Sequence, residues 1–170
     1  MRFALRIGVA AFAAAALSHW LTPAGEGVPL FCFPAGIVFG ALLLCEWRDW
    51  WIVVAVAGAA DLATGIGSVE EGNVLHPLLH HAGISLGALT TAGLIRRRVT
   101  EIRQLALLRN PAWMLALGAG TLFLGMVAAH YPTWTGAHGP AHLLTWFMSA
   151  LGGLLLVTPV WLAWSTRPQG

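Results

Sequence analysis

The chain has 170 residues, of which 58% are hydrophobic and 9% are charged, and its mean hydropathy is +0.74. Soluble domains carry about 25% charged residues, so this composition excludes an ordinary soluble globular protein and predicts an integral membrane protein. All nine basic residues are arginine and the formal net charge is only +2, which leaves nothing to support nucleic-acid binding.

The apolar segments predict an all-α fold, a polytopic membrane helix bundle that forms one domain over residues 1–170. The fourth segment is about 33 Å long at roughly 1.5 Å per residue, which is enough to cross a bilayer. We interpret the alanine-rich first segment as a retained span and not as a cleaved signal peptide, because further spans follow it. The six expected transmembrane helices cover about residues 3–21, 30–45, 51–66, 74–95, 112–130 and 142–164.

All the arginines fall on one side of this arrangement when the N-terminus is cytoplasmic. Arginine-rich loops stay in the cytoplasm, and an even number of spans returns the C-terminus to the same side. The sequence therefore predicts that both termini are cytoplasmic, with tryptophans forming an aromatic belt near the interfaces. The arginines are Arg2, Arg6, Arg48, Arg96, Arg97, Arg98, Arg103, Arg109 and Arg167, and the interfacial tryptophans are Trp20, Trp47, Trp50, Trp51, Trp134 and Trp164.

Small residues recur four positions apart in three of the expected helices, at Ala11/Ala15, Gly36/Gly40 and Gly83/Gly87. In lipid such spacings let helix backbones approach closely, so they favour a tightly packed bundle. The two cysteines, Cys32 and Cys45, are about 20 Å apart along the second helix, which excludes a disulfide within it.

One acidic residue and several histidines are predicted to lie within or at the outer end of the bundle. Asp61 is expected roughly 9 Å below the outer end of the third helix, and His80 and His81 at a similar depth in the fourth. Ionisable groups at this depth are costly unless they face the bundle and each other. Helical spacing places Gly58, Asp61 and Gly65 on one face; it places His76, His80, Gly83, Gly87 and Thr91 on another, and His142, Trp146, Ser149 and Gly153 on a third.

Three interpretations of the outer histidines are open. They can be interhelical hydrogen-bonding groups that complete helix ends. A subset can bind a metal ion or haem b together with Asp61, since imidazole suits transition metals and pairs four residues apart can reach one ion. They can also titrate between pH 5 and 8 and report outside acidity. The candidate ligands are Asp61, His19, His76, His80, His81, His138 and His142.

Residues 99–109 form a short amphipathic segment that we expect to lie on the inner membrane surface. The sharper alternative is that this segment docks a cytoplasmic partner. The candidate docking residues are Arg96, Arg97, Arg98, Ile102 and Leu105.

Two stretches resemble a known family. The run FCFPAGIVFGALLL at 31–44, followed by Trp50-Trp51 and by DLATG at 61–65, is similar to the W-x-P-P-A-G-I-A-x-A-A-L-L-L … W-P … N-L-L-T-G pattern of the first type of bacterial membrane-associated sensor (MASE) domain. The run LLTWFMSALGGLLLVTPVWLAW at 143–164 resembles that family's W-L-T-W-W-L-G-D-A-L-G-V-L-L-V-T-P-L-L-L-A-W helix. The motif residues are Pro34, Ala35, Gly36, Trp146, Gly152 and Pro159.

The resemblance implies a non-enzymatic input domain of the bacterial inner membrane, normally fused to a histidine kinase, diguanylate cyclase or phosphodiesterase. This chain departs from the pattern at Ser149, where the family carries an acidic residue. The family domain usually continues with about two further helices, and no output domain follows Trp164 here, so a separate kinase or cyclase is expected as the partner.

Three functions are therefore open. The first is a sensory input domain that acts through a separate partner. The second is a small-solute or metal-binding subunit of a membrane transporter, since six-helix substrate-binding components have this size. The third is a vestigial, truncated sensor domain.

Overall fold

The computed structural model describes residues 2–22, 30–65, 75–98, 118–120, 122–125, 127 and 140–165. This part of the chain is helical and contains no strand. The longer elements are α1 (Arg2–Trp20), α2 (Phe33–Leu44), the 3-10 turn η1 (Trp47–Asp49), α3 (Trp50–Gly65), α4 (Leu75–Arg98) and α7 (Pro140–Ser165). Residues 118–120, 122–125 and 127 are also helical.

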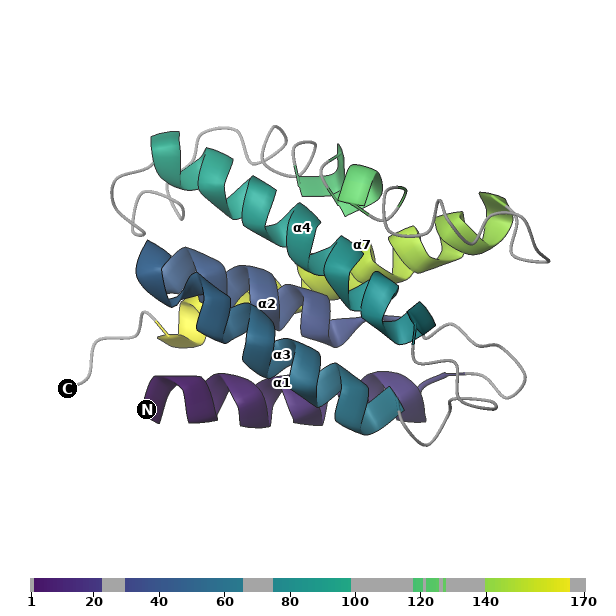
Figure 1. Ribbon diagram of the computed structural model, residues 1–170, viewed down its shortest axis with the longest axis horizontal. Helices are drawn as coiled ribbons and strands as arrows, with labels where there is room; N and C mark the ends of the chain where they lie inside the picture. The colour runs from purple at the N-terminus through teal and green to yellow at the C-terminus, as the bar shows by residue number, and fades with distance from the viewer. Residues whose placement is uncertain are drawn as a thin grey trace.

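Helix α2 lies at the centre of the described helices and contacts α1, α3, α4 and α7 (Figure 1). Its sequence is apolar on all sides, which is typical of a helix with neighbours all round. Ten consecutive residues, from Pro34 to Leu43, are buried accordingly. Figure 1 also shows the start of α1 and the end of α7 at the same end of the described helices.

The outer surface of the described helices is rich in large apolar side chains. Helix α1, for example, exposes 68% of Leu5 and 62% of Val9. The stretch Leu143–Trp164 of α7 is long and apolar enough to span a membrane, and only 33% of its apolar window is buried inside the structure. The apolar stretches Leu5–Trp20 and Phe33–Leu44 are shorter.

The start of α2 is anchored by polar contacts from two other helices. The Cys32 N–H donates to the Ser149 carbonyl on α7 at 3.0 Å, and the Phe33 N–H donates to the Ser18 hydroxyl on α1 at 3.1 Å. Pro34 has no N–H to satisfy. Because Cys32 makes no side-chain cap, Ser18 supplies the missing acceptor across the helix interface.

The predicted small-residue pairs lie at helix contacts. Ala11 and Ala15 are buried. A Cβ added at Gly36 would lie 2.6 Å from the Val157 Cβ, and one added at Gly40 would lie 2.8 Å from the Trp161 ring. Gly125 packs on the Gly83–Gly87 turn of α4. These close approaches of α2 to α7, and of residues 122–125 to α4, confirm the tight packing expected from the spacing.

Several predicted boundaries need correction. Helix α2 begins at Phe33, not near residue 30, because Cys32 is bound to the α7 backbone and Pro34 favours the first helical turn. Helix α4 continues past Ile95 to Arg98, where basic side chains suit the negative end of the helix dipole.

Segment 46–50, between the second and third expected helices, contains the turn η1, and Trp50 is buried within the protein. The other four described interfacial tryptophans, Trp20, Trp47, Trp51 and Trp164, are at least 60% exposed. Residues 99–109 and most of the expected fifth helix lie outside the described residues.

Candidate functional site

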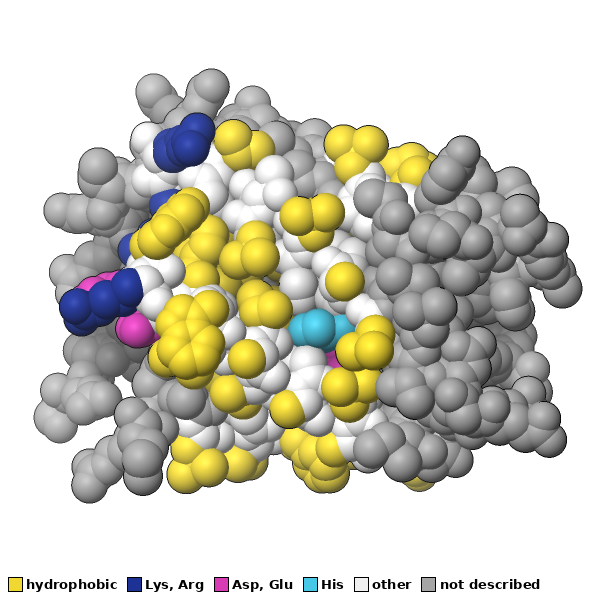
Figure 2. Space-filling model, in the orientation of Figure 1, with side chains coloured by type: hydrophobic (Ala, Val, Ile, Leu, Met, Phe, Trp, Pro, Cys, Tyr) yellow, Lys and Arg dark blue, Asp and Glu magenta, His cyan; other side chains and the backbone are white. Residues whose placement is uncertain are grey.

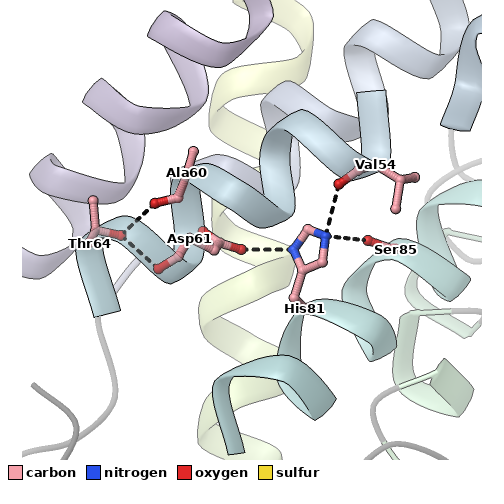
Figure 3. A network of polar contacts seen from close by, with 6 residues as sticks. All are labelled: Val54, Ala60, Asp61, Thr64, His81 and Ser85. Carbon is pink, nitrogen blue, oxygen red and sulfur yellow. Dashed lines mark hydrogen bonds and ion pairs between the residues drawn. The ribbon is translucent and has the colours of Figure 1, made fainter. Parts of the chain in front are cut away.

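The structure brings Asp61 of α3 and His81 of α4 together. The His81 Nδ1 lies 2.9 Å from the Asp61 Oδ2, and the two side chains are only 12% and 22% exposed (Figure 3). Since a carboxylate can only accept, the Nδ1 atom carries a proton and donates. The contact links two helices within an otherwise apolar bundle, which is the arrangement predicted for Asp61.

The other ring nitrogen of His81 lies within hydrogen-bond distance of a carbonyl oxygen and of a hydroxyl group. Its Nε2 lies 3.1 Å from the Val54 carbonyl oxygen and 3.2 Å from the Ser85 Oγ. The carbonyl can only accept, so Nε2 donates to it when the ring is protonated; in the neutral ring a bare Nε2 accepts from the Ser85 hydroxyl. The same geometry therefore supports both charge states with different hydrogen bonds.

A glycine makes room for the imidazole. A Cβ added at Gly58 would lie 2.8 Å from the His81 Nε2, so α3 presents bare backbone at the point where the ring sits. Gly58 and Asp61 share a face of α3, as their spacing predicted, and this face meets α4. Thr64, one turn further along, donates within the described part of the chain to carbonyls of its own helix, those of Ala60 and Asp61.

The Asp61–His81 pair is partly exposed on the side of the bundle. Figure 2 shows a histidine side chain with an acidic one beside it on the face where α3 and α4 lie side by side, away from the dark-blue arginines. A shallow hollow elsewhere, lined by apolar residues and Thr91 between α2, α4 and α7, has no room for a water molecule. The described polar site is thus a partly exposed contact between two helices, not an enclosed chamber.

Asp61, His81 and Ser85 are connected in the same order as the acid, base and nucleophile of a serine hydrolase. Ser85, however, is only 4% exposed, so a substrate carbonyl has no approach to its hydroxyl. The arrangement favours a hydrogen-bond relay within the bundle over nucleophilic attack.

The described residues bring only two of the proposed metal or haem ligands together. They contain no cluster of three or more His, Cys, Asp or Glu side chains that could hold a metal. Both nitrogens of His81 are engaged, so coordination would require a hydrogen bond to break. His19 is exposed at the end of α1. The side chains of His76, His80 and His142, and all of His138, lie outside the described part.

The proposed docking residues lie at the other end of α4. The Arg96 guanidinium donates to the Cys45 carbonyl at the end of α2, and Arg97 is exposed. Arg98 ends α4, although its side chain, Ile102 and Leu105 lie outside the described residues. Arg96 therefore ties α4 to the turn between α2 and α3.

The two stretches that carried the family resemblance pack against each other. Gly36 contacts Gly153 and Val157, and Gly152 contacts the Phe31 ring. Pro34, Ala35 and Trp146 are buried, whereas Pro159 is exposed within α7. Ser149, at the family's acidic position, is buried, and its hydroxyl has no hydrogen-bond partner among the described residues.

Sequence reasoning did not identify Ser85 or the Val54 carbonyl as parts of the site. The spacing of Ser85, four residues after His81 on one helix, was the available signal. Nothing in the sequence marks a main-chain carbonyl on another helix.

No family model, no curated protein and no solved structure matches the chain.

Proposed function

We propose that this chain is a multi-pass sensory input domain of a bacterial inner membrane, with six spans and cytoplasmic termini. The apolar outer surface supports this placement, since a helix such as α7 that is apolar yet mostly exposed suits lipid better than water. The resemblance to membrane-associated sensor domains gives the expected role, and a separate kinase or cyclase is the proposed partner.

One observation carries the proposal: among the described residues, two ionisable side chains of helix α4 contact neighbouring elements at well-separated points of the helix. His81 meets Asp61 on α3, and Arg96 meets the Cys45 carbonyl after α2. The two residues are 15 positions apart, about 22 Å along a helix at roughly 1.5 Å per residue. A signal that changes the His81 contact can therefore displace the end of α4 as a rigid element.

The proposed signal is any event that alters the charge or hydrogen bonding of the Asp61–His81 pair. Protonation of His81 would move Nε2 from accepting the Ser85 hydroxyl to donating to the Val54 carbonyl. This gain of a hydrogen bond between α3 and α4 would change how the two helices pack. The described residues offer no observation that favours the transport alternative.

The proposal is tested by the position of the end of α4. Nitroxide labels are placed at Arg6→Cys and Arg98→Cys, with Cys32 and Cys45 changed to Ala, and the full chain is reconstituted in liposomes. Asp61→Asn removes the charge of the pair without changing its size. We expect this variant to shift the label-to-label distance by about 1–2 Å, the usual size of a helix displacement.

The matched control is Thr64→Ala, one turn away on the same helix, which removes only bonds within α3. This control should leave the distance unchanged. If Asp61→Asn and His81→Gln both give the same distance as the Thr64→Ala control, α4 does not transmit the state of the pair and the sensory proposal fails.

A further inference from the structure

The C-terminal part of α4, which ends in arginines, lies beside the exposed indole ring of Trp47 at Gly93. A Cβ added at Gly93 would lie 3.8 Å from the Trp47 Cζ3 and 3.9 Å from the Trp50 Cη2, so this face of α4 packs on η1. Arg97 follows Gly93 by four residues and therefore continues the same face one turn on. Trp47 is 67% exposed, and its ring centroid lies 4.4 Å from that of the buried Trp50, with the two rings tilted.

The two guanidinium groups differ in what already binds them. Arg96 is half-buried, and among the described residues its guanidinium donates to the Cys45 carbonyl, which uses one of its five N–H groups. Arg97 is exposed and has no ion-pair partner among the described residues. Arg48, in contrast, is paired with Glu46 at 2.8 Å. Arg96 and Arg97 thus follow, within about one helical turn, the position of α4 that contacts the Trp47 ring.

A guanidinium group can donate two parallel hydrogen bonds to the oxygens of one phosphate. Indole rings are enriched at the level of the lipid headgroups. Figure 2 shows dark-blue arginines next to hydrophobic side chains at the end where α1 begins and α7 ends. A ligand that binds here would carry a phosphate group to accept hydrogen bonds from the arginines and an apolar part to contact the Trp47 ring. We propose that Arg96, Arg97 and Trp47 bind the headgroup of an anionic phospholipid of the inner leaflet.

This inference rests on the proposed membrane placement, in which the end of α4 is cytoplasmic. The placement is tested separately by a phosphatase reporter fused after Arg98, which should be inactive if that end faces the cytoplasm. A failed lipid test with an inactive reporter would refute the lipid site alone, whereas an active reporter would refute the placement.

The lipid site is tested on the purified full chain in a zwitterionic detergent. Dihexanoyl phosphatidylglycerol is titrated against the chain, with dihexanoyl phosphatidylcholine as the neutral comparison, and binding is measured from the thermal unfolding shift and by native mass spectrometry. We expect the anionic lipid alone to bind, and Arg97→Gln to weaken that binding about fivefold, which corresponds to the ~1 kcal/mol typical of one arginine near a charged membrane.

Arg6→Gln on α1 is the matched control, since it removes an exposed arginine from another helix. It should leave the affinity unchanged. Arg96→Gln should weaken binding, and Arg96→Lys should restore part of it by keeping the charge, even if the Cys45 contact is lost.

Three outcomes would overturn the proposal. The first is equal binding of the neutral and anionic lipids. The second is an equal effect of Arg97→Gln and Arg6→Gln. The third is full competition by millimolar inorganic phosphate, which would indicate a site for a free anion and not for a lipid.

Discussion

Replacing Gly36 by Ala should separate α2 from α7. The new Cβ would lie 2.6 Å from the Val157 Cβ and would also meet the Gly153 carbonyl oxygen. Carbon atoms rest about 3.5–4.0 Å apart, so the helices must separate by roughly 1 Å. Neither obstacle can rotate away, because one atom is backbone and the other is attached directly to it.

That separation would also break two hydrogen bonds. Thr158 Oγ1 donates to the Gly36 carbonyl at 3.1 Å, and the Cys32 N–H donates to the Ser149 carbonyl at 3.0 Å. Each is worth roughly 0.5–1.5 kcal/mol, and overpacking adds about 1–3 kcal/mol. We therefore expect Gly36→Ala to lower the free energy of unfolding by about 2–6 kcal/mol.

The measurement is unfolding in mixed micelles with increasing dodecyl sulfate, followed by tryptophan fluorescence. Gly120→Ala is the control, because a Cβ there meets nothing within 4 Å. The control should be neutral or more stable by up to about 1 kcal/mol, since alanine is the better helix former. Equal stability of the Gly36→Ala and Gly120→Ala variants would refute the close α2–α7 contact.

Two further predictions concern polar contacts between helices. Ser18→Ala should lower the free energy of unfolding by about 1–2 kcal/mol in the same assay, because it leaves the partly buried Phe33 N–H without its acceptor; an unchanged stability would contradict the cap. Asp61→Leu alone should destabilise by about 1–3 kcal/mol, because the His81 Nδ1–H loses its partner, whereas Asp61→Leu with His81→Leu should regain most of that loss. A double variant less stable than the single one would refute this account of the pair.

The sequence predicted the parts of the structure that depend on periodicity. Helix positions follow from apolar runs, and the depth of Asp61 and His81 follows from counting residues along two helices, so their proximity was a reasonable expectation. The contact of Arg96 with the Cys45 carbonyl could not be predicted in the same way. It depends on the angle between α4 and the turn after α2. Every residue has a main-chain carbonyl, so the sequence does not indicate which one accepts the bond.

The burial of Trp50 was missed for a related reason. A tryptophan next to a charged turn is usually interfacial, and Trp47 and Trp51 on either side are indeed exposed. The Trp50 ring instead packs inward beside Gly93 of α4, where an added Cβ would lie 3.9 Å from the ring, an ordinary van der Waals distance. Pairing of a large residue with a glycine 43 positions away requires the helix arrangement to be known first.

The contacts that hold the bundle differ in how easily they can change. Apolar surfaces give little specific attraction between helices in lipid, so close backbone approach and hydrogen bonds must fix their positions. Helices α2 and α7 meet through glycines and main-chain groups, which no change of charge can alter. The polar contacts described for α4 instead use ionisable side chains, His81 with Asp61 and Arg96 with a helix end. A proton or an anion can change these contacts without opening the core. The α3–α4 side is therefore where a signal could act on an otherwise fixed bundle, and this is the physical basis of the sensory proposal.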